Sequence, residues 1–151
     1  MTPFRTVAWS VVAGAGLALT VTCAALSAGN PMDERQATMK QVGQTMKEAS
    51  AFTSAQTPFD AAKVKALMGG IAGSAKKLHG LYPAGSGSDP KSAADPKIWE
   101  NKADFDKRLT EMGALAAAAG KATSTDSFKP AFSSLGATCK SCHDIYRKKK
   151  T

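Results

Sequence analysis

The chain has 151 residues, a length that suits one domain. Its 20 lysines and arginines outnumber its 12 acidic residues and give a formal net charge of +8. A basic balance favours acidic partners or anionic surfaces. No nucleic-acid recognition motif accompanies that charge, so we expect no nucleic-acid binding. No Ser/His/Asp set, carboxylate pair or phosphate loop is present, so ordinary side-chain catalysis is not expected.

Residues 1–28 have the composition of an export signal. Arg5 is their only charged residue, and residues 7–28 form an uncharged run rich in Val, Ala, Leu and Gly. Cleavage after the small residues at its end leaves a domain of residues 29–151, whose charge falls from +8 to +7 with the loss of Arg5. The alternative is an uncleaved anchor, because about 20 apolar residues can span a bilayer. Both alternatives place the domain outside the cytoplasm.

The first predicted helix spans residues 32–52 and follows an Asn-Pro pair at 30–31, a typical helix start. Its apolar residues recur at helical spacing, and three methionines lie seven residues apart on one stripe. The predicted inner face contains Met32, Met39, Val42, Met46, Ala49 and Phe52. A turn ending at Pro58 leads to the second predicted helix, 61–79, for which Asp60 is a suitable N-cap.

The second predicted helix has one apolar face and a cluster of glycines. The apolar face contains Val64, Leu67, Met68, Ile71, Ala75 and Leu78. Gly69, Gly70 and Gly73 each weaken the helix by about 1 kcal/mol relative to alanine. We interpret them as a place where something bulky packs against the backbone. The Gly-, Pro- and Ser-rich connection 80–96 is long enough to indicate a functional loop or a crossover between distant helix ends.

Two more amphipathic helices follow. The third is predicted from Ile98 to Ala119, stopped by Gly120, and its run of small residues at 114–119 permits close approach of another helix. Its predicted inner face contains Phe105, Leu109, Met112, Ala116 and Ala119. The fourth begins at residues 125–127, and its predicted inner face contains Phe128, Ala131, Phe132, Leu135, Thr138, Cys139, Cys142, Ile145 and Tyr146. Four such helices without a strand pattern predict an all-α, antiparallel four-helix bundle.

The last predicted helix carries the sequence C-x-x-C-H at residues 139–143, which is the attachment signal for a c-type haem. Its two thiols lie about one helical turn apart. Cys139 and Cys142 can therefore add to the two vinyl groups of a porphyrin, while His143 binds the iron from below. We expect one covalently attached haem c inside the bundle. Such attachment occurs outside the bacterial cytoplasm, so the motif and the export signal together predict the periplasm.

Other uses of the cysteine pair are weaker. A structural zinc site needs about four ligands, and only Cys23 in the leader and His79 remain. A thioredoxin-like pair is expected near a βαβ pattern, and none is visible. An unmodified thiol pair is the third alternative. His79 lies near a helix end and is expected to be solvated.

The chain after about residue 32 resembles the cytochrome c prime family, the class II c-type cytochromes. The position of the haem motif near the C-terminus carries most of this resemblance. The matching segments are Arg35-Gln36, Met39-Lys40, Pro58 to Asp60, Leu81 to Pro83, Pro96 to Trp99 and Gly136 to Arg147.

The resemblance implies a role for Met39. A methionine at helical spacing is ordinarily core filler, but in one branch of the family the matching methionine is the sixth iron ligand. Met39-Lys40 resembles this low-spin, electron-carrying branch, which implies electron transfer through iron bound by His143 and Met39. The alternative is a five-coordinate, high-spin protein that binds NO or CO, with Met39 only capping the distal face. Met32 and Met46 share the stripe and are the rival ligands.

The resemblance also implies roles for three polar residues and for the partners. Arg35, with help from Gln36, is expected to pair with a haem propionate, a bond that suits a guanidinium. Arg147 is expected to lie along the proximal imidazole. We expect a transient and acidic redox partner, and relatives of this kind suggest a homodimer through the first two helices. The basic run 147–150 is interpreted as a solvated helix end.

Overall fold

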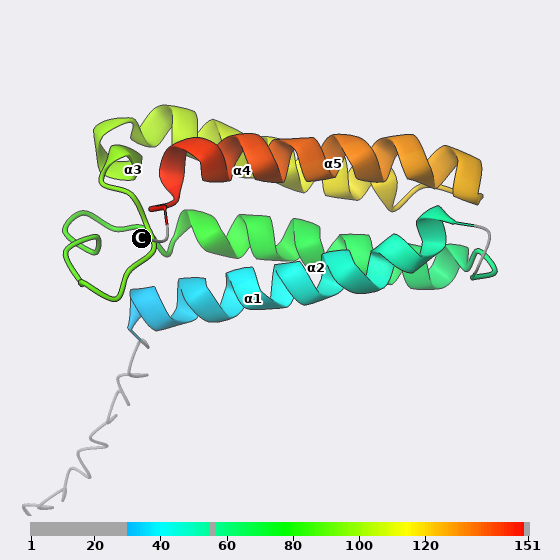
Figure 1. Ribbon diagram of the computed structural model, residues 1–151, viewed down its shortest axis with the longest axis horizontal. Coiled ribbons are helices and arrows are strands. Elements are labelled where there is room, and N and C mark those ends of the chain that lie inside the picture. Colours follow the sequence, from blue (N-terminus) through cyan, green and yellow to red (C-terminus); the bar gives the residue numbers. More distant parts are fainter. Residues whose placement is uncertain (1–29, 55–56, 150–151) are drawn as a thin grey trace, which may run out of the picture.

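The computed structural model describes residues 30–54 and 57–149, so the predicted export signal at 1–28 lies outside the described part (Figure 1). The helices are α1 (Pro31–Ser50), the short 3-10 helix η1 (Ala51–Thr53), α2 (Ala61–His79), α3 (Lys97–Glu100), α4 (Lys102–Ala119) and α5 (Thr125–Tyr146). The four long helices lie side by side in an antiparallel bundle, with the α1–α2 pair facing the α4–α5 pair (Figure 1). The predicted all-α four-helix bundle is therefore confirmed.

Side-chain caps fix where three of the helices begin. The Asn30 side chain accepts a hydrogen bond from the Met32 backbone N–H at 3.0 Å, and Asp60 accepts one from Lys63 at 2.9 Å. These bonds satisfy N–H groups that have no partner within the helix. Helix α5 begins at Thr125, and its N-cap is Ser124, just before the predicted cap at 125–127; Ser124 forms a reciprocal capping box with Ser127.

The prediction of one continuous helix from 98 to 119 is wrong at its start. Asn101 has non-helical backbone angles, φ −128° and ψ 47°, and separates α3 from α4. Helix α3 is a single turn whose first amide, that of Lys97, donates to the Asp95 carboxylate at 3.0 Å. The Trp99 indole N–H donates to the Pro83 carbonyl at 2.8 Å, which ties this turn to the preceding loop. The apolar period continues across the break, so it gave no sign of the interruption.

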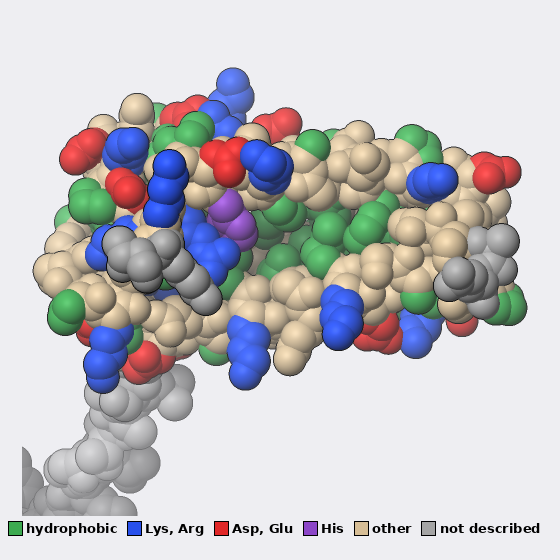
Figure 2. Space-filling view, in the orientation of Figure 1, with side chains coloured by type: hydrophobic (Ala, Val, Ile, Leu, Met, Phe, Trp, Pro, Cys, Tyr) green, Lys and Arg blue, Asp and Glu red, His purple; other side chains and the backbone are tan. Residues whose placement is uncertain are grey.

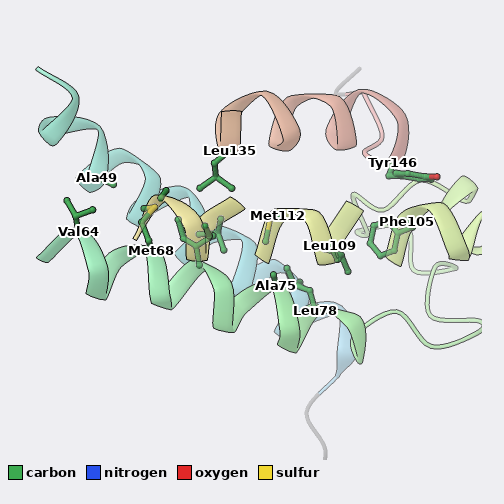
Figure 3. Packing of buried hydrophobic residues seen from close by; sticks show 14 of the residues in the cluster. Ala49, Val64, Met68, Ala75, Leu78, Phe105, Leu109, Met112, Leu135 and Tyr146 are labelled. Carbon is green, nitrogen blue, oxygen red and sulfur yellow. The ribbon is translucent and has the colours of Figure 1, made fainter. Parts of the chain in front are cut away.

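The core lies between α2 and α4 and is closed by α5. Figure 3 shows Ala75 and Leu78 of α2 near Leu109 and Met112 of α4, with Met68 further along α2, and all five are buried. Small residues make this approach close. A Cβ added at Gly113 would lie 3.3 Å from the Ala75 Cβ, and one at Gly120 would lie 3.2 Å from the Met68 Cβ. The expected close packing of a helix against the small-residue end of α4 is therefore observed.

One sequence-based assignment to the core was wrong, and another was not met within the described residues. No atom of these residues lies within 4 Å of a Cβ added at Gly69, Gly70 or Gly73, so a bulky neighbour of these glycines stays a prediction. Ile145 was assigned to the inner face of the last helix, but it is 37% exposed because the adjacent Tyr146 fills the buried position at that end. Within the described residues, no helix combines the length and the apolar character needed to cross a membrane.

The connection between α2 and α3, which we term the 80–96 loop, extends around one end of the bundle (Figure 1). The chain after α5 is extended, because Arg147 has φ −112° and ψ 127°, and it pairs with this loop. The Asp95 amide donates to the Tyr146 carbonyl, and the Lys148 amide donates to the Ala93 carbonyl, each at 2.9 Å. The described part of the basic run is thus attached to the loop and is not simply the solvated end of a helix.

Candidate haem-binding site

A cavity separates α1 from α5 and consists of two adjoining hollows of about 550 and 290 Å³. Met39 and Gly43 of α1 and Cys142 and His143 of α5 line both hollows, which makes them one continuous space. Ligand pockets commonly measure about 300–1,000 Å³. Figure 2 shows the apolar hollow between the two layers of helices, with a histidine and basic side chains at one end of it. The cavity is therefore large enough and apolar enough for a flat organic cofactor.

The two cysteines of the motif lie on α5 where that helix faces the cavity. Both are half-buried and neither is in a disulfide. Burial raises the pKa of the Cys139 thiol and of the Cys142 thiol, so both remain protonated at neutral pH. Cys142 lines both hollows, whereas Cys139 lines only the smaller one. This arrangement is consistent with the prediction that both thiols lie on the cofactor-facing side of the last helix.

His143 lies at the rim of the cavity, on the helical turn that ends α5. Partial burial, followed by the positive charge of Arg147, lowers the pKa of its imidazole, and Asp144 acts in the opposite direction. The imidazole is therefore neutral at neutral pH, and the neutral ring is the form that binds a metal. Arg147 also lines the larger hollow, and its placement along the imidazole of His143 stays a prediction.

Met39 lies on the opposite wall, on α1, and is half-buried. Among the methionines of the described residues it alone lines both hollows, since Met46 and Met112 line the smaller one and Met32 lines neither. The structure thus separates Met39 from its two rivals by position. His79 lies outside the cavity: its Nδ1 is 3.3 Å from Asp106 Oδ1, and it is half-buried between α2 and α4 rather than simply solvated.

Arg35 and Gln36 line the larger hollow, as a role near a propionate requires. Arg35 is nevertheless only 3% exposed, and its two terminal nitrogens donate to the 80–96 loop. The acceptors are the Leu81 carbonyl, the Ser86 hydroxyl and carbonyl and the Ser92 hydroxyl, at 3.4, 3.0, 2.6 and 2.9 Å. The Gln36 side-chain amide donates to the Lys91 carbonyl at 3.2 Å. Their pairing with a propionate stays a prediction.

A polar cluster beside the cavity was not predicted. Asp104 and Arg108 are not part of the predicted inner face of their helix, but Arg108 lines the smaller hollow. One oxygen of Asp104 accepts hydrogen bonds from the Tyr146 hydroxyl at 2.6 Å and from Arg108 Nε at 2.7 Å. These two donors, Arg108 first, lower the pKa of the Asp104 carboxyl. The four-residue spacing of Asp104 and Arg108 was visible in the sequence, but their contact with the last helix was not.

These residues fit a covalently attached haem. Two thiols one turn apart stand beside a neutral imidazole, a thioether faces them, and the walls between are apolar. Basic side chains at the rim, such as Lys40 and Lys91, suit the carboxylates of such a group. A helical bundle with this donor set on its last helix defines the class of c-type, haem-bearing four-helix proteins.

Comparison with known proteins gives the family. The family profile described as Cytochrome C' matches residues 30–147. The cytochrome c' of Rhodopseudomonas palustris is 37% identical over 147 residues, covering 97% of this chain and 96% of that protein. A cytochrome c-556 of Agrobacterium fabrum is 38% identical over 128 residues, covering 83% and 86% of the two chains. The solved Rhodopseudomonas palustris cytochrome c' has a TM-score of 0.75 at 38% identity, covering 81% and 98%.

The chain therefore belongs to the cytochrome c' family, the class II c-type cytochromes. As a member of that family, it binds haem c covalently through its cysteines, and Cys139 and Cys142 are the pair in the described part of the chain. Proteins of this family bind haem and serve as electron carriers or gas-binding proteins. The predicted family, fold and cofactor are confirmed.

Proposed function

We propose that the protein carries single electrons, with His143 and Met39 as the two axial ligands of the iron. Bound haem c supplies an iron that alternates between the ferrous and ferric states. The protein's own contribution is to hold both ligands in place in each state and to exclude water from the apolar cavity. A thioether opposite an imidazole also raises the reduction potential.

One observation carries this proposal: Met39 and His143 face the same cavity from the first and last helices of the bundle. Both side chains line both hollows, and no other methionine of the described chain does so. Methionine has the flexibility to adjust its sulfur to a ligand.

An absorption spectrum of the reduced holoprotein, recorded with and without CO, tests the proposal. If Met39 is bound to iron, the alpha and beta bands are sharp and CO changes nothing. Met39→Ala should then give a broad spectrum that shifts with CO, whereas Met46→Ala, the matched control on the same helix, should keep sharp bands. Sharp bands and CO indifference in Met39→Ala would show that another group is the sixth ligand.

The second candidate function is the binding of NO or CO by five-coordinate iron. The observation that favours it is the smaller hollow beside Met39, an apolar space lined also by Val42, Met46 and Leu109. In that case Met39 only caps the distal face. The wild-type protein would then respond to CO without any substitution, which is the opposite of the outcome expected above.

The remaining features of the proposal concern where the protein works and what it meets. We propose cleavage of residues 1–28, a periplasmic location and no enzymatic activity beyond electron carriage. The unpaired cations at the cavity rim, Lys40, Lys91 and Arg147, favour an acidic redox partner. We also propose a homodimer with its contact at α1 and α2; dimerisation as such is supported by a 30% identical cytochrome c' structure that is described as having ligand-controlled dimer dissociation. Sedimentation of the reduced protein with and without CO tests that dimer.

A further inference from the structure

We propose that the 80–96 loop sets the separation of Met39 and His143, and that Arg35 is the positioning residue through which it does so. This inference rests on the proposed axial ligation, because the loop matters to the iron only if Met39 has to reach it. The loop is attached to α1 on one side of the cavity and to the end of α5 on the other. It is therefore a brace between the two walls that carry the ligands.

The attachment to α1 is made by Arg35 alone among the charged residues of that helix. Four hydrogen bonds run from its guanidinium to Leu81, Ser86 and Ser92, the shortest being 2.6 Å. The same guanidinium lies 5.2 Å from the centre of the Tyr82 ring and 5.8 Å from that of Trp99. Charge-assisted hydrogen bonds and cation–π contacts are both strengthened by burial. Residues of the loop thus surround the Arg35 side chain.

Arg35 is only 3% exposed, and all four hydrogen bonds of its guanidinium go to the 80–96 loop. The predicted pairing with a haem propionate would add a counter-ion on the cavity side. Burial of a cation is costly unless hydrogen bonds replace its water. The loop supplies those acceptors, so the charge and the loop conformation depend on each other. Because of this mutual dependence, Arg35 is a buried structural residue that holds the loop against α1.

The attachment to α5 is made by backbone hydrogen bonds. The Asp95 amide donates to the Tyr146 carbonyl and the Lys148 amide donates to the Ala93 carbonyl, each at 2.9 Å. An aromatic series supports the same connection through the core. Tyr82 of the loop packs edge-on against Phe105 with ring centres 4.6 Å apart, and Phe105 packs against Tyr146 at 5.3 Å.

The positions of these attachments relative to the ligands carry the inference. Arg35 precedes Met39 by four residues, which is one helical turn, and Tyr146 follows His143 by three. The loop therefore holds the turn next to each proposed ligand. Helices α1 and α5 pack mainly against α2 and α4 respectively, and the cavity lies between them. Without the brace, the width of the cavity at the ligands depends on the contacts among the helix pairs and on the packing of η1 against α5.

The test uses the haem-loaded protein and three variants. Arg35→Gln removes the charge, and the double variant Ser86→Ala with Ser92→Ala removes two acceptors while leaving Arg35 in place. The matched control is Lys77→Gln, which breaks the 3.2 Å ion pair of Lys77 with Glu34, next to Arg35 on α1, but does not touch the loop. If Arg35→Gln does not fold, the double variant still tests the proposal.

Three measurements are compared among the proteins. Hydrogen exchange at the Asp95 and Lys148 amides reports on the attachment of the loop to the last helix. Spin labels on the exposed positions Gln44 of α1 and Ser133 of α5, introduced as cysteines, report the distance across the cavity. The charge-transfer band of methionine-bound ferric iron, together with CO binding by the ferrous form, reports axial ligation.

In both loop variants we expect the two amides to exchange roughly tenfold faster, since one charge-assisted hydrogen bond corresponds to about one tenfold step in an equilibrium constant. The spin-label distances should broaden, the methionine band should weaken and CO binding should appear. Lys77→Gln should change none of these. Unchanged spin-label distances in both loop variants would overturn the proposal, as would an intact methionine band despite faster exchange.

A failure of the proposed function gives a different pattern. If the wild-type protein itself lacks the methionine band and binds CO, Met39 is not a ligand and the inference falls with it, whatever the labels show. If the band is present in the wild type and the loop variants retain both the band and the wild-type distances, only the bracing role of the loop is refuted. The spectrum of the wild-type protein therefore distinguishes a failure of the proposed Met39 ligation from a failure of the bracing role of the loop.

Discussion

The exposed glycines of α2 give a sharp test of the packing described above. Gly70 and Gly73 are one turn apart on the solvent side of the helix, and a Cβ at either position meets no atom within 4 Å. Alanine at each position should therefore add helix propensity without any steric cost, about 0.5–1 kcal/mol per site. Since the two gains are independent, Gly70→Ala with Gly73→Ala should stabilise the fold by about 1–2 kcal/mol.

The matched control is Gly113→Ala in the middle of α4. The same gain in helix propensity applies there, but the new Cβ would lie 3.3 Å from the Ala75 Cβ at the closest approach of α2 and α4. Crowding of a packed helix interface typically costs 1–3 kcal/mol, with about 1 kcal/mol at the mild end. We therefore expect Gly113→Ala to be neutral or destabilising, in contrast to the pair on α2.

Urea unfolding of the holoprotein measures these differences. With slopes of about 1–3 kcal/mol per molar urea for small proteins, the α2 double variant should raise the midpoint by roughly 0.5–1 M. The measurement is made at a protein concentration at which sedimentation shows a monomer. A lower midpoint in the double variant under those conditions would refute the reasoning, because something within the chain would then pack against those glycines. A lower midpoint only at high concentration would instead locate a dimer contact on α2.

Two further predictions concern the polar cluster and the core. Because Arg108 and the Tyr146 hydroxyl hold the pKa of Asp104 below its ordinary value of 3.8, this carboxylate contributes stability above its unfolded pKa, and the contribution is lost as pH falls through the folded pKa. Asp104→Asn should therefore lose less stability than the wild type on acidification, measured as urea midpoints against pH, and equal acid slopes would contradict this. Leu78→Ala, at a fully buried position, should cost about 2–5 kcal/mol in the same assay, and a cost near zero would show that the site is solvated.

Much of the fold was predictable because it follows from local patterns. The second helix was expected over residues 61–79 and is observed as Ala61–His79. Here the N-cap, the apolar period and the terminal glycine all indicate the same helix boundaries. A segment is predictable when its independent local signals agree in this way. The role of the cysteine pair was equally predictable, because haem attachment depends on the spacing of the two thiols within one helical turn.

The features that escaped prediction depend on residues distant in the sequence. Arg35 and Ser92 are 57 positions apart, and no period or motif links them. The same holds for Asp104 and Tyr146, which are 42 positions apart. The break at Asn101 lies two residues after Trp99, whose indole donates to the Pro83 carbonyl, a contact that exists only in the folded chain. Tertiary contacts of this kind override the local preference for a continuous helix.

The cavity is walled by the first and the last helix of the described chain, and this order has a consequence for biogenesis. Residues 39–46 on one side have no facing wall until residues 136–147 on the other have been made and delivered. Pocket assembly therefore depends on contacts between the two ends of the sequence, which form slowly compared with local ones. The α1–α2 hairpin can fold through local contacts, but the cofactor compartment is complete only when α5 packs across from α1.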